Sequence, residues 1–499
     1  MIASGLSVGP QALGVAGATP DDTDGTATAY RSDIKEGASN SEIWDLADGR
    51  GHSPLVPNTS VRLCDPGCLP PGAMWASSFF RHSVNCSKLG PVTGNVWILG
   101  GYQSDFARNL TRESADFADL TREVVDHTLA ESMIDAEDID VVHVANAFGE
   151  MFAGQGHLGA MPATVHDGLW DTPATRHEAA CASGSAAALA AMADLRAGNY
   201  RTALVVGLEL EKTVPGDLAA QHLGAAAWTG HEGQDATYMW PYMFNQVAEE
   251  YDRRYGIDDA HLRAIAAVNL ANARRNPNAQ TRDWRVPDLA SDGGDDRINP
   301  RIEGRIRRFD CSQMTDGGAG VVLVGDEFLA EHPGVRPIGR VEGWGHRTVG
   351  LGLRQKLNRD AANPYVMPHV RAAVQEAFDR AAVSLDGIDG FEVHDCFTPS
   401  EYLAIDHIGL TGPGESWKAI ENGDIEIGGR LPINPSGGLI GGGHPVGATG
   451  IRMMLDAAKQ VSGLAGDYQI DGARRFGTLN IGGSTATTIS FVIGSGEAA

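Results

Sequence analysis

The stretch Val96-Trp-Ile-Leu-Gly-Gly101 decides where the folded part of the chain begins and what kind of fold follows. Four large apolar residues before two glycines predict a buried strand and a tight turn. Apolar residues then recur at helical spacing, at Phe117, Leu120, Val124, Val125, Leu129 and Met133, and a second strand is predicted over 141–148. Strands that alternate with helices indicate an α/β fold with parallel strands and helices on the faces of the sheet.

The residues before this strand have a different composition. Asp21, Asp22 and Asp24 stand among small polar residues, and several prolines follow, so we predict that residues 1–95 form a flexible extension. Cys64 and Cys68 flank Asp-Pro-Gly, and Cys86 follows. A structural zinc site needs a second pair of ligands, and none is near, so we expect these thiols to hold no metal.

The alternation continues after the first two strands and then starts again. A helix is predicted over 183–197 and a strand over 202–208, and from Ile338 onward the same order of elements returns up to a last strand over 488–493. The segment 211–318 interrupts the first series and is predicted to be an insertion over the sheet edge. Two similar halves, 96–335 and 336–499, indicate an internal duplication with a site between the halves, outside the strand ends.

Charge and composition exclude several classes of function. The 499 residues include 39 basic and 64 acidic ones, which gives a net charge of −25 and argues against nucleic acid as a partner. Six cysteines fit a reducing compartment. The sequence has no apolar run of ~18 residues and no secretory signal pattern. We therefore expect no membrane span and a cytoplasmic location.

Cys181 is the strongest candidate for a nucleophile. It stands in Glu178-Ala-Ala-Cys-Ala-Ser-Gly-Ser185, directly before an alanine-rich helix. The positive end of the helix dipole is expected to lower the pKa of the thiol and favour the thiolate.

Two further segments carry histidines. His444 lies in a loop with five glycines, Gly441 to Gly450, and histidine is the natural base for a thiol near neutral pH. His394 and Cys396 follow a predicted strand and lie two residues apart, so they extend on the same side and suit an acid/base pair. No further ligands stand at matching spacing, so we expect no metal.

A last segment, Thr478-Leu-Asn-Ile-Gly-Gly-Ser484, runs from a strand into a glycine turn. Its side chains offer no acid or base. Its backbone N–H groups could face a developing oxyanion, or the segment could simply join two strands.

Taken together, these segments resemble the thiolase family over roughly residues 96–493. Cys181-Ala-Ser183 resembles its nucleophile motif, and Asn434-Pro-Ser-Gly-Gly438 with Gly443-His444-Pro445 resembles its histidine motif. The segment 310–318 resembles the one that closes the family's loop domain. The commonest thiolases have cysteine where Asn480 stands and Asn-Glu-Ala-Phe where His394-Asp-Cys396-Phe stands, and both changes resemble the sterol-carrier-protein-2 type.

The resemblance implies a duplicated five-layer α-β-α-β-α fold with an inserted loop domain, and roles for single residues. Cys181 would attack a 3-ketoacyl thioester, His444 would take its proton, and Cys396 would protonate the leaving enolate. His444 with His394 would stabilise one oxyanion, and the N–H groups of Cys181 and Gly482 the other. The reverse reaction would join two acyl-CoA molecules.

The resemblance also implies the ligands and the assembly. Coenzyme A would be a co-substrate, with no permanently bound cofactor, and the inserted loop domain would hold it. Ser312 aligns with the position that contacts the pantetheine arm. Arginines would bind the phosphates, with Arg307 and Arg308 as the main candidates besides Arg305, Arg274 and Arg275. A homodimer or homotetramer is expected.

Two other functions remain open at this point. Some thiolase-like proteins are retro-aldol lyases, but those lack the nucleophilic cysteine. A non-catalytic acyl-CoA-binding subunit is the second alternative.

Overall fold

The computed structural model describes residues 94–496. The predicted extension, with Cys64, Cys68 and Cys86, lies outside these residues except for its last two positions. Among the described residues, no helix combines the length and the apolar character that crossing a bilayer requires.

Within residues 94–496, nine strands form one mixed sheet in the order β3-β2-β4-β7-β1-β8-β11-β10-β9. Their bounds are β1 Val96–Gln103, β2 Val141–Ala145, β3 Ala174–His177, β4 Thr202–Glu209, β7 Gly317–Gly325, β8 Gly339–Thr348, β9 Gly390–Val393, β10 Arg475–Gly482 and β11 Thr487–Gly494. A separate two-stranded ribbon pairs β5 (Arg301–Glu303) with β6 (Ile306–Arg307).

The strand order confirms the predicted duplication. In the first half, β1 pairs antiparallel with β7, β7 antiparallel with β4, and β4 parallel with β2. In the second half, β8, β11, β10 and β9 follow in the same order with the same directions. The halves join where β1 and β8 pair over residues 96–98 and 339–341. The exact domain boundaries stay predictions.

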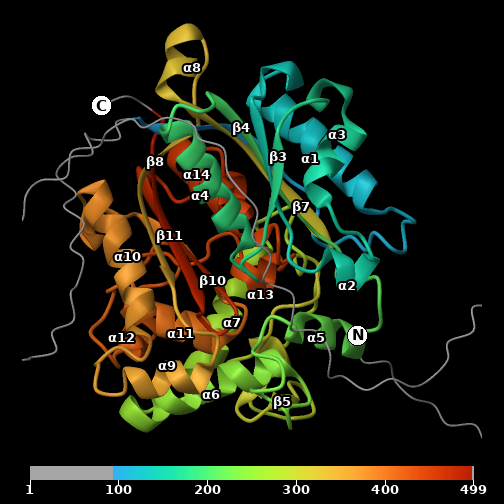
Figure 1. Cartoon of the computed structure of the whole chain (residues 1–499). Coiled ribbons are helices and arrows are strands. Elements are labelled where there is room, and N and C mark those ends of the chain that lie inside the picture. Colours follow the sequence, from blue (N-terminus) through green and yellow to red (C-terminus); the bar gives the residue numbers. More distant parts are fainter. Residues whose placement is uncertain (1–93, 497–499) are drawn as a thin grey trace, which may run out of the picture. The chain divides into compact units, whose positions relative to one another are not determined.

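The helices complete the layers (Figure 1). Their bounds are α1 Phe117–Ser132, α2 Gly149–Ala153, α3 Met161–Val165, α4 Ser183–Arg196, α5 Gly216–Gly224, α6 Met239–Tyr255, α7 Asp259–Ala273, α8 Asp326–Glu331, α9 Leu353–Arg359, α10 Pro368–Ala381, α11 Thr398–His407, α12 Ser416–Glu421, α13 Gly438–Gly442 and α14 Thr449–Ser462. Helix α1 packs on β1 and β7, and α10 packs on β8 and β11. Helices α4 and α14 pack against each other, α4 also packs against strands of the first half, and α14 packs against strands of both halves.

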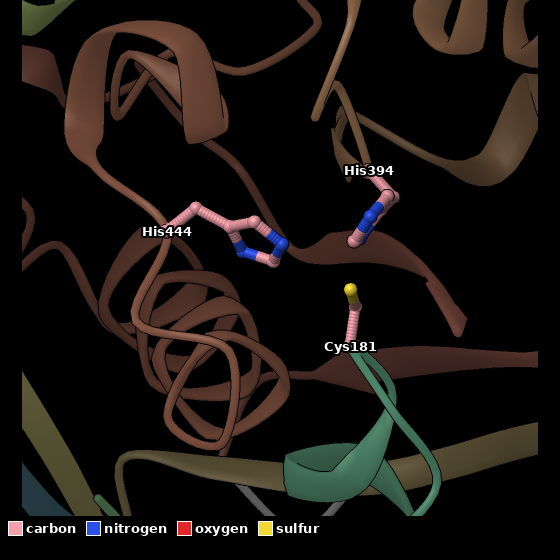
Figure 2. A group of neighbouring side chains, drawn as sticks. All are labelled: Cys181, His394 and His444. Carbon is pink, nitrogen blue, oxygen red and sulfur yellow. The ribbon is translucent and has the colours of Figure 1, made fainter. Parts of the chain in front are cut away.

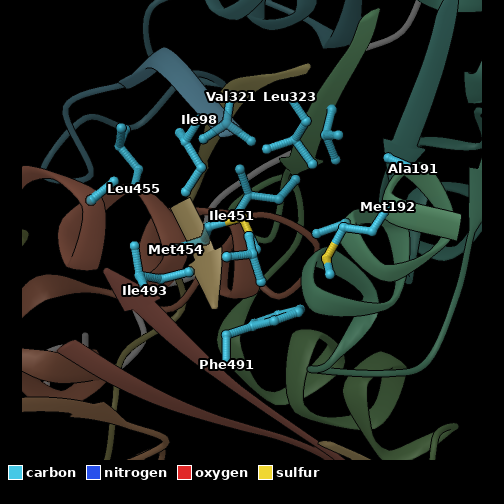
Figure 3. Close-up of a cluster of buried hydrophobic side chains, with 14 of the residues drawn as sticks. Ile98, Ala191, Met192, Val321, Leu323, Ile451, Met454, Leu455, Phe491 and Ile493 are labelled. Atoms are coloured by element: carbon cyan, nitrogen blue, oxygen red, sulfur yellow. The ribbon is translucent and has the colours of Figure 1, made fainter. Parts of the chain in front are cut away.

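The alternation of side chains along the strands produces these layers. In β1, Val96 and Ile98 join the central core with α4 and α14, while Trp97 and Leu99 join the outer core with α1. Figure 3 shows the central core, where Met192 of α4 and Ile451 of α14 meet strand residues of both halves. Because successive side chains of a strand point to opposite faces, each half-sheet has a helical layer on both faces. The predicted five-layer α/β fold is thereby confirmed.

Three details differ from the sequence-based expectation. The sheet is mixed and not parallel, since the pairs β1–β7, β7–β4, β8–β11 and β11–β10 are antiparallel. Helices α6 and α7 of the segment 211–318 pack on α11, and α7 also packs on α12 and α13, so much of this segment covers helices of the second half instead of the sheet edge. The apolar residues Met243, Val247 and Tyr251 explain the placement, because they belong to the core cluster of α11. Strand β3 was not predicted, since its exposed, polar residues form no apolar pattern.

Candidate active site

Cys181 lies in a strained turn between β3 and α4. Ala180, directly before it, has a φ of 50°, a left-handed conformation that is uncommon for residues other than glycine. The Ser183 hydroxyl holds this turn, because it donates to the Ala180 carbonyl at 2.6 Å and accepts from the Ala179 N–H at 2.9 Å. The turn thereby places Cys181 directly before the N-terminus of α4.

The structure brings Cys181 together with both predicted histidines. The Cys181 sulfur and one ring nitrogen each of His394 and His444 all lie within 4.8 Å of one another. Figure 2 shows the sulfur below and between the two rings, which come from different segments of the second half. The rings meet edge to face, with centroids 5.1 Å apart. The site therefore lies between the halves of the duplication.

A hydroxyl group fixes the protonation of His444. The Thr449 hydroxyl donates to the Pro445 carbonyl at 3.0 Å, so it accepts the hydrogen bond from His444 Nδ1 at 2.7 Å. The proton of the neutral ring is therefore on Nδ1. His444 Nε2 is buried and has no hydrogen-bond partner among the residues that the structure describes, so its lone pair is available to a proton donor such as a thiol.

Asn480 fixes the opposite tautomer at His394. Its amide nitrogen donates to the Cys181 carbonyl at 3.1 Å and contacts His394 Nδ1 at 3.1 Å, while its oxygen accepts from the Ser185 hydroxyl. Since the amide nitrogen donates, His394 Nδ1 accepts, and its proton is on Nε2. His394 thus presents a hydrogen-bond donor, and His444 presents an acceptor.

The electrostatics correct one prediction about Cys181. Burial, with a smaller contribution from the charge of nearby Glu211, raises the pKa of this thiol to about 12. The expected lowering by the helix dipole is wrong in direction, because the cysteine precedes the helix and packs against an apolar cluster that includes Phe148 and Val446. Loss of hydration outweighs the dipole there. The resting group is therefore a neutral thiol.

Both histidines also rest in the neutral form. Burial lowers the pKa of His444 to about 3, and it lowers the pKa of His394 well below its usual range. The buried guanidinium of Arg452 acts in the same direction on both rings. Arg452 is itself held by Glu392 at 2.7 Å and Asp456 at 3.0 Å.

Cys396 lies next to this group in a buried apolar cluster that includes Phe244, Phe397 and Leu439. Burial raises the pKa of its thiol well above the usual range, and the neighbouring Cys181 contributes to the rise. The carbonyl of Cys396 accepts a hydrogen bond from the Ser312 N–H at 2.9 Å. This backbone hydrogen bond holds Ser312, the predicted pantetheine contact, next to the site.

The glycine turn after β10 lies against Cys181. The residue whose N–H faces the sulfur differs from the predicted one. The N–H that points at the Cys181 sulfur belongs to Gly483, one residue after the predicted Gly482, and the N–H of Cys181 also points at it. Gly482 instead provides close approach, because a Cβ there would lie 2.2 Å from the Ala179 carbonyl oxygen. An N–H of this segment therefore does face the nucleophile.

The arginine predictions separate into two groups. Arg307 is buried and donates to Asp296 at 2.6 Å and to the Asn299 carbonyl at 2.7 Å, so its guanidinium is engaged inside the protein. Arg305 lies among three carboxylates at 3.2 to 3.6 Å. Neither is available to a phosphate, and the prediction of Arg307 is wrong. Arg308, like Arg274 and Arg275, is exposed.

A cavity of about 660 Å³ lies beside Arg308. Trp284, Arg285 and Phe309 are among the residues that line it. Arg285 was not predicted, because no spacing in the sequence brings it to Arg308. The cavity combines two cationic side chains with aromatic rings.

Thiolate sulfur and imidazole nitrogen are also zinc ligands, so Cys181, His394 and His444 are of the types that hold this metal. The expectation of a metal-free site stays a prediction.

Several contributors were missed from the sequence. Thr449, Asn480 and Gly483 all stand inside the motifs that were singled out, but their roles depend on contacts between segments. Asn434 is another: its side chain accepts from the Val393 N–H at 2.8 Å and so fixes the strand end before His394.

Comparison with known proteins identifies the family of this chain. Residues 96–290 match the family model described as thiolase, N-terminal domain, and residues 354–495 match the one described as thiolase C-terminal domain-like. The chain belongs to the thiolase family. Its relatives include the acetyl-CoA acetyltransferase of Methanothermobacter thermautotrophicus, which is 30% identical over 79% of this chain and 97% of its own length. Human sterol carrier protein 2 is 26% identical over 83% of this chain and 75% of its own length.

Solved structures show the same fold at lower identity. The Ltp2-ChsH2(DUF35) aldolase has a TM-score of 0.64 at 18% identity and covers 82% of this chain and 100% of its own. Human mitochondrial 3-ketoacyl-CoA thiolase, solved in complex with CoA, has a TM-score of 0.60 at 15% identity, covering 81% and 98%. The family supports an acyl-CoA acyltransferase.

Proposed function

We propose that this protein is a thiolase that cleaves a 3-ketoacyl-CoA with coenzyme A, or condenses two acyl-CoA molecules in the reverse direction, through an acyl-cysteine at Cys181. The observation that carries the proposal is the position of the Cys181 sulfur between an imidazole that accepts a proton and one that donates a hydrogen bond.

In the first half-reaction, His444 Nε2 takes the proton of the Cys181 thiol while the sulfur attacks the 3-keto carbon. The N–H groups of Gly483 and Cys181 stabilise the oxyanion. The bond between C2 and C3 then breaks and leaves an acyl group on Cys181 and a CoA-thioester enolate. The enolate oxygen accepts from His394 Nε2–H, and the Cys396 thiol gives its proton to the enolate carbon. The raised pKa of Cys396 suits this role, since the thiol is protonated when the enolate forms.

In the second half-reaction, the Cys396 thiolate takes the proton of incoming coenzyme A. The CoA sulfur attacks the acyl group on Cys181 and forms the shortened acyl-CoA. The Cys181 sulfur leaves and recovers its proton from His444. Both cysteines and both histidines return to their resting forms, so coenzyme A is a co-substrate and no permanent cofactor is required.

We further propose that the cavity at Arg285 and Arg308 holds the phosphorylated end of coenzyme A. Arginine forks suit phosphate oxygens, and the rings of Trp284 and Phe309 suit a purine. Replacing both arginines by alanine is expected to raise KM for acyl-CoA about tenfold or more with kcat nearly unchanged. An unchanged KM would contradict this placement.

The proposed function is tested by mass spectrometry after mixing with acetyl-CoA. The wild type is expected to gain an acetyl group, and Cys181→Ala is expected to gain none. Cys396→Ala is expected to be acetylated but to form no acetoacetyl-CoA. A retro-aldol lyase or a non-catalytic subunit would stay unmodified, so an unmodified wild type would overturn the proposal. Full turnover by Cys396→Ala would overturn only the acid/base role of that residue.

We also propose that the protein acts in the cytoplasm as a homodimer or homotetramer. Light scattering of the purified chain tests the assembly, and a monomer would contradict it.

A further inference from the structure

The turn between β10 and β11 has a strained backbone. Gly483 has a φ of 61° and Thr485 a φ of 65°. Threonine is branched at Cβ, and such residues strongly disfavour this left-handed region. A strained conformation persists only where its surroundings hold it. The same turn contains the Gly483 N–H that points at the Cys181 sulfur.

Two side chains from helices outside the reacting group hold this turn. The Lys356 ammonium of α9 donates to the Ser484 hydroxyl at 2.9 Å and to the Leu351 carbonyl at 2.9 Å. His369 of α10 has its Nε2 at 2.9 Å from the Thr485 carbonyl and 3.0 Å from the Thr485 hydroxyl. Each residue of the turn that follows Gly483 is therefore tied to a different helix.

The direction of the hydrogen bonds at Thr485 is defined. Its hydroxyl donates to the Met367 sulfur at 3.5 Å, so it accepts from His369, whose Nε2 carries the proton. His369 therefore donates both hydrogen bonds to Thr485, and both restrain this residue in its strained conformation.

Lys356 is unusual because it is a buried lysine whose side chain forms no ion pair in the described part of the chain. It is 4% exposed. Burial lowers its pKa to about 8, and the charge of Glu232 opposes the shift. His369 is neutral, since burial lowers its pKa to about 4. A buried ammonium is costly, and its hydrogen bonds to neutral acceptors are stronger than those of a neutral donor.

We propose that Lys356 and His369 are positioning residues that hold the turn 483–485 so that the Gly483 N–H meets the oxyanion formed on the carbonyl carbon attacked by Cys181. The inference rests on the proposed function and deepens it, because it explains how helices α9 and α10, which contribute no reacting group, determine the rate of acylation.

The test compares two reactions of the same sulfur. Acylation of Cys181 by acetyl-CoA passes through an oxyanion, whereas alkylation by iodoacetamide does not. Lys356→Met is expected to slow acylation about 10- to 100-fold, because loss of a whole oxyanion donor costs about 10²–10³-fold and the variant only displaces the donor. It is expected to change the alkylation rate less than threefold. KM for acyl-CoA is expected to stay within about twofold, since the proposal places the turn at the reacting carbonyl and not at the CoA.

Ser484→Ala provides a second variant that leaves the lysine in place and removes only its hydroxyl partner. It is expected to slow acylation about tenfold, and the double variant is expected to be no slower than Lys356→Met, because both changes break the same hydrogen bond. Lys418→Met is the matched control, since its ammonium lies at the surface near Glu415. It is expected to leave acylation unchanged.

The outcomes separate the two claims. If the wild type is acylated and Lys356→Met is acylated equally fast, the positioning role is overturned and the proposed function stands. Equal losses in acylation and alkylation would show general damage and would also overturn it, as would additive effects of the two variants. If the wild type itself is not acylated, both claims fail.

Discussion

The Thr449 hydroxyl selects which nitrogen of His444 serves as base, because it accepts a hydrogen bond from Nδ1–H and leaves the Nε2 lone pair free. Thr449→Val keeps the shape of the side chain but removes this acceptor. We expect Cys181 acylation to slow about 10- to 100-fold, since the ring can then adopt the wrong tautomer. Thr449→Ser should restore most of the rate. A time course of acetylation by mass spectrometry measures both, and an unchanged rate in Thr449→Val would contradict the assignment.

The pKa of Cys181 gives a second expectation for this residue. Because burial raises it to about 12, the thiolate fraction is expected to grow with each step in pH up to at least pH 9. Alkylation by iodoacetamide should therefore accelerate about tenfold per pH unit and should not level off near pH 8.5, as an ordinary cysteine does.

Acylation is expected to behave differently from alkylation. His444 accepts the proton in the reaction, and its lowered pKa of about 3 keeps it neutral. The acylation rate should therefore not decline through loss of this base between pH 8 and pH 5. A fall near pH 6.5 in the acylation profile would show that the base has an ordinary histidine pKa, contrary to the structure.

At the scale of elements, the approach of α4 to α14 brings the nucleophile to its base. Gly184, on α4, lies so close to the start of α14 that a Cβ would come within 2.8 Å of the Ile451 nitrogen and 3.0 Å of the Gly447 oxygen. Backbone atoms cannot give way there. Gly184→Ala is expected to cost about 1–3 kcal/mol of unfolding free energy and to slow acylation by separating Cys181 from His444.

Urea unfolding and acylation of Gly184→Ala measure the two effects. Gly216→Ala is the matched control, since a Cβ there meets no atom within 4 Å. If Gly184→Ala is as stable and as active as this control, the close packing of the two helices does not determine the geometry of the site.

At the scale of the whole molecule, buried titratable groups set the pH dependence of stability. Burial lowers the pKa of His143 and His369 to about 4 and of His444 to about 3. As pH falls below 6.5, these histidines become protonated in the unfolded chain while they stay neutral in the folded chain, so the free energy of unfolding decreases. Burial raises the pKa of Glu209 and Glu392 to about 7, so these groups add stability as pH falls from 7 to 4.5.

We therefore expect Tm to reach a maximum between pH 4.5 and 7 and to fall below pH 4.5. There Glu209 and Glu392 are protonated in both states, whereas the histidines and carboxyl groups with a lowered pKa, such as Glu250, still differ between the folded and unfolded chain. Thermal unfolding monitored by circular dichroism at half-unit pH steps measures this. His143→Gln should make the acid-side fall less steep, and an unchanged slope in that variant would contradict the role of the buried histidine.

The sequence by itself determined the fold class, the two halves and the segments that form the site. Strands and long helices carry a local signal, since burial of one face imposes a period on apolar residues. Cys181, His394, His444 and the glycine turn were found for the same reason: each stands at the end of a predicted element. The exposed β3 carries no such period and was missed.

Only the tertiary structure decided the charge and hydrogen-bonding state of those residues. The hydration that a group loses depends on what packs around it, so no pattern in the sequence indicated that burial reverses the expected pKa shift of Cys181. The engagement of Arg307 by Asp296, the tautomers set by Thr449 and Asn480, and the support of the glycine turn by Lys356 all join segments distant along the chain. Such contacts depend on how separate elements pack, and local patterns do not encode that packing.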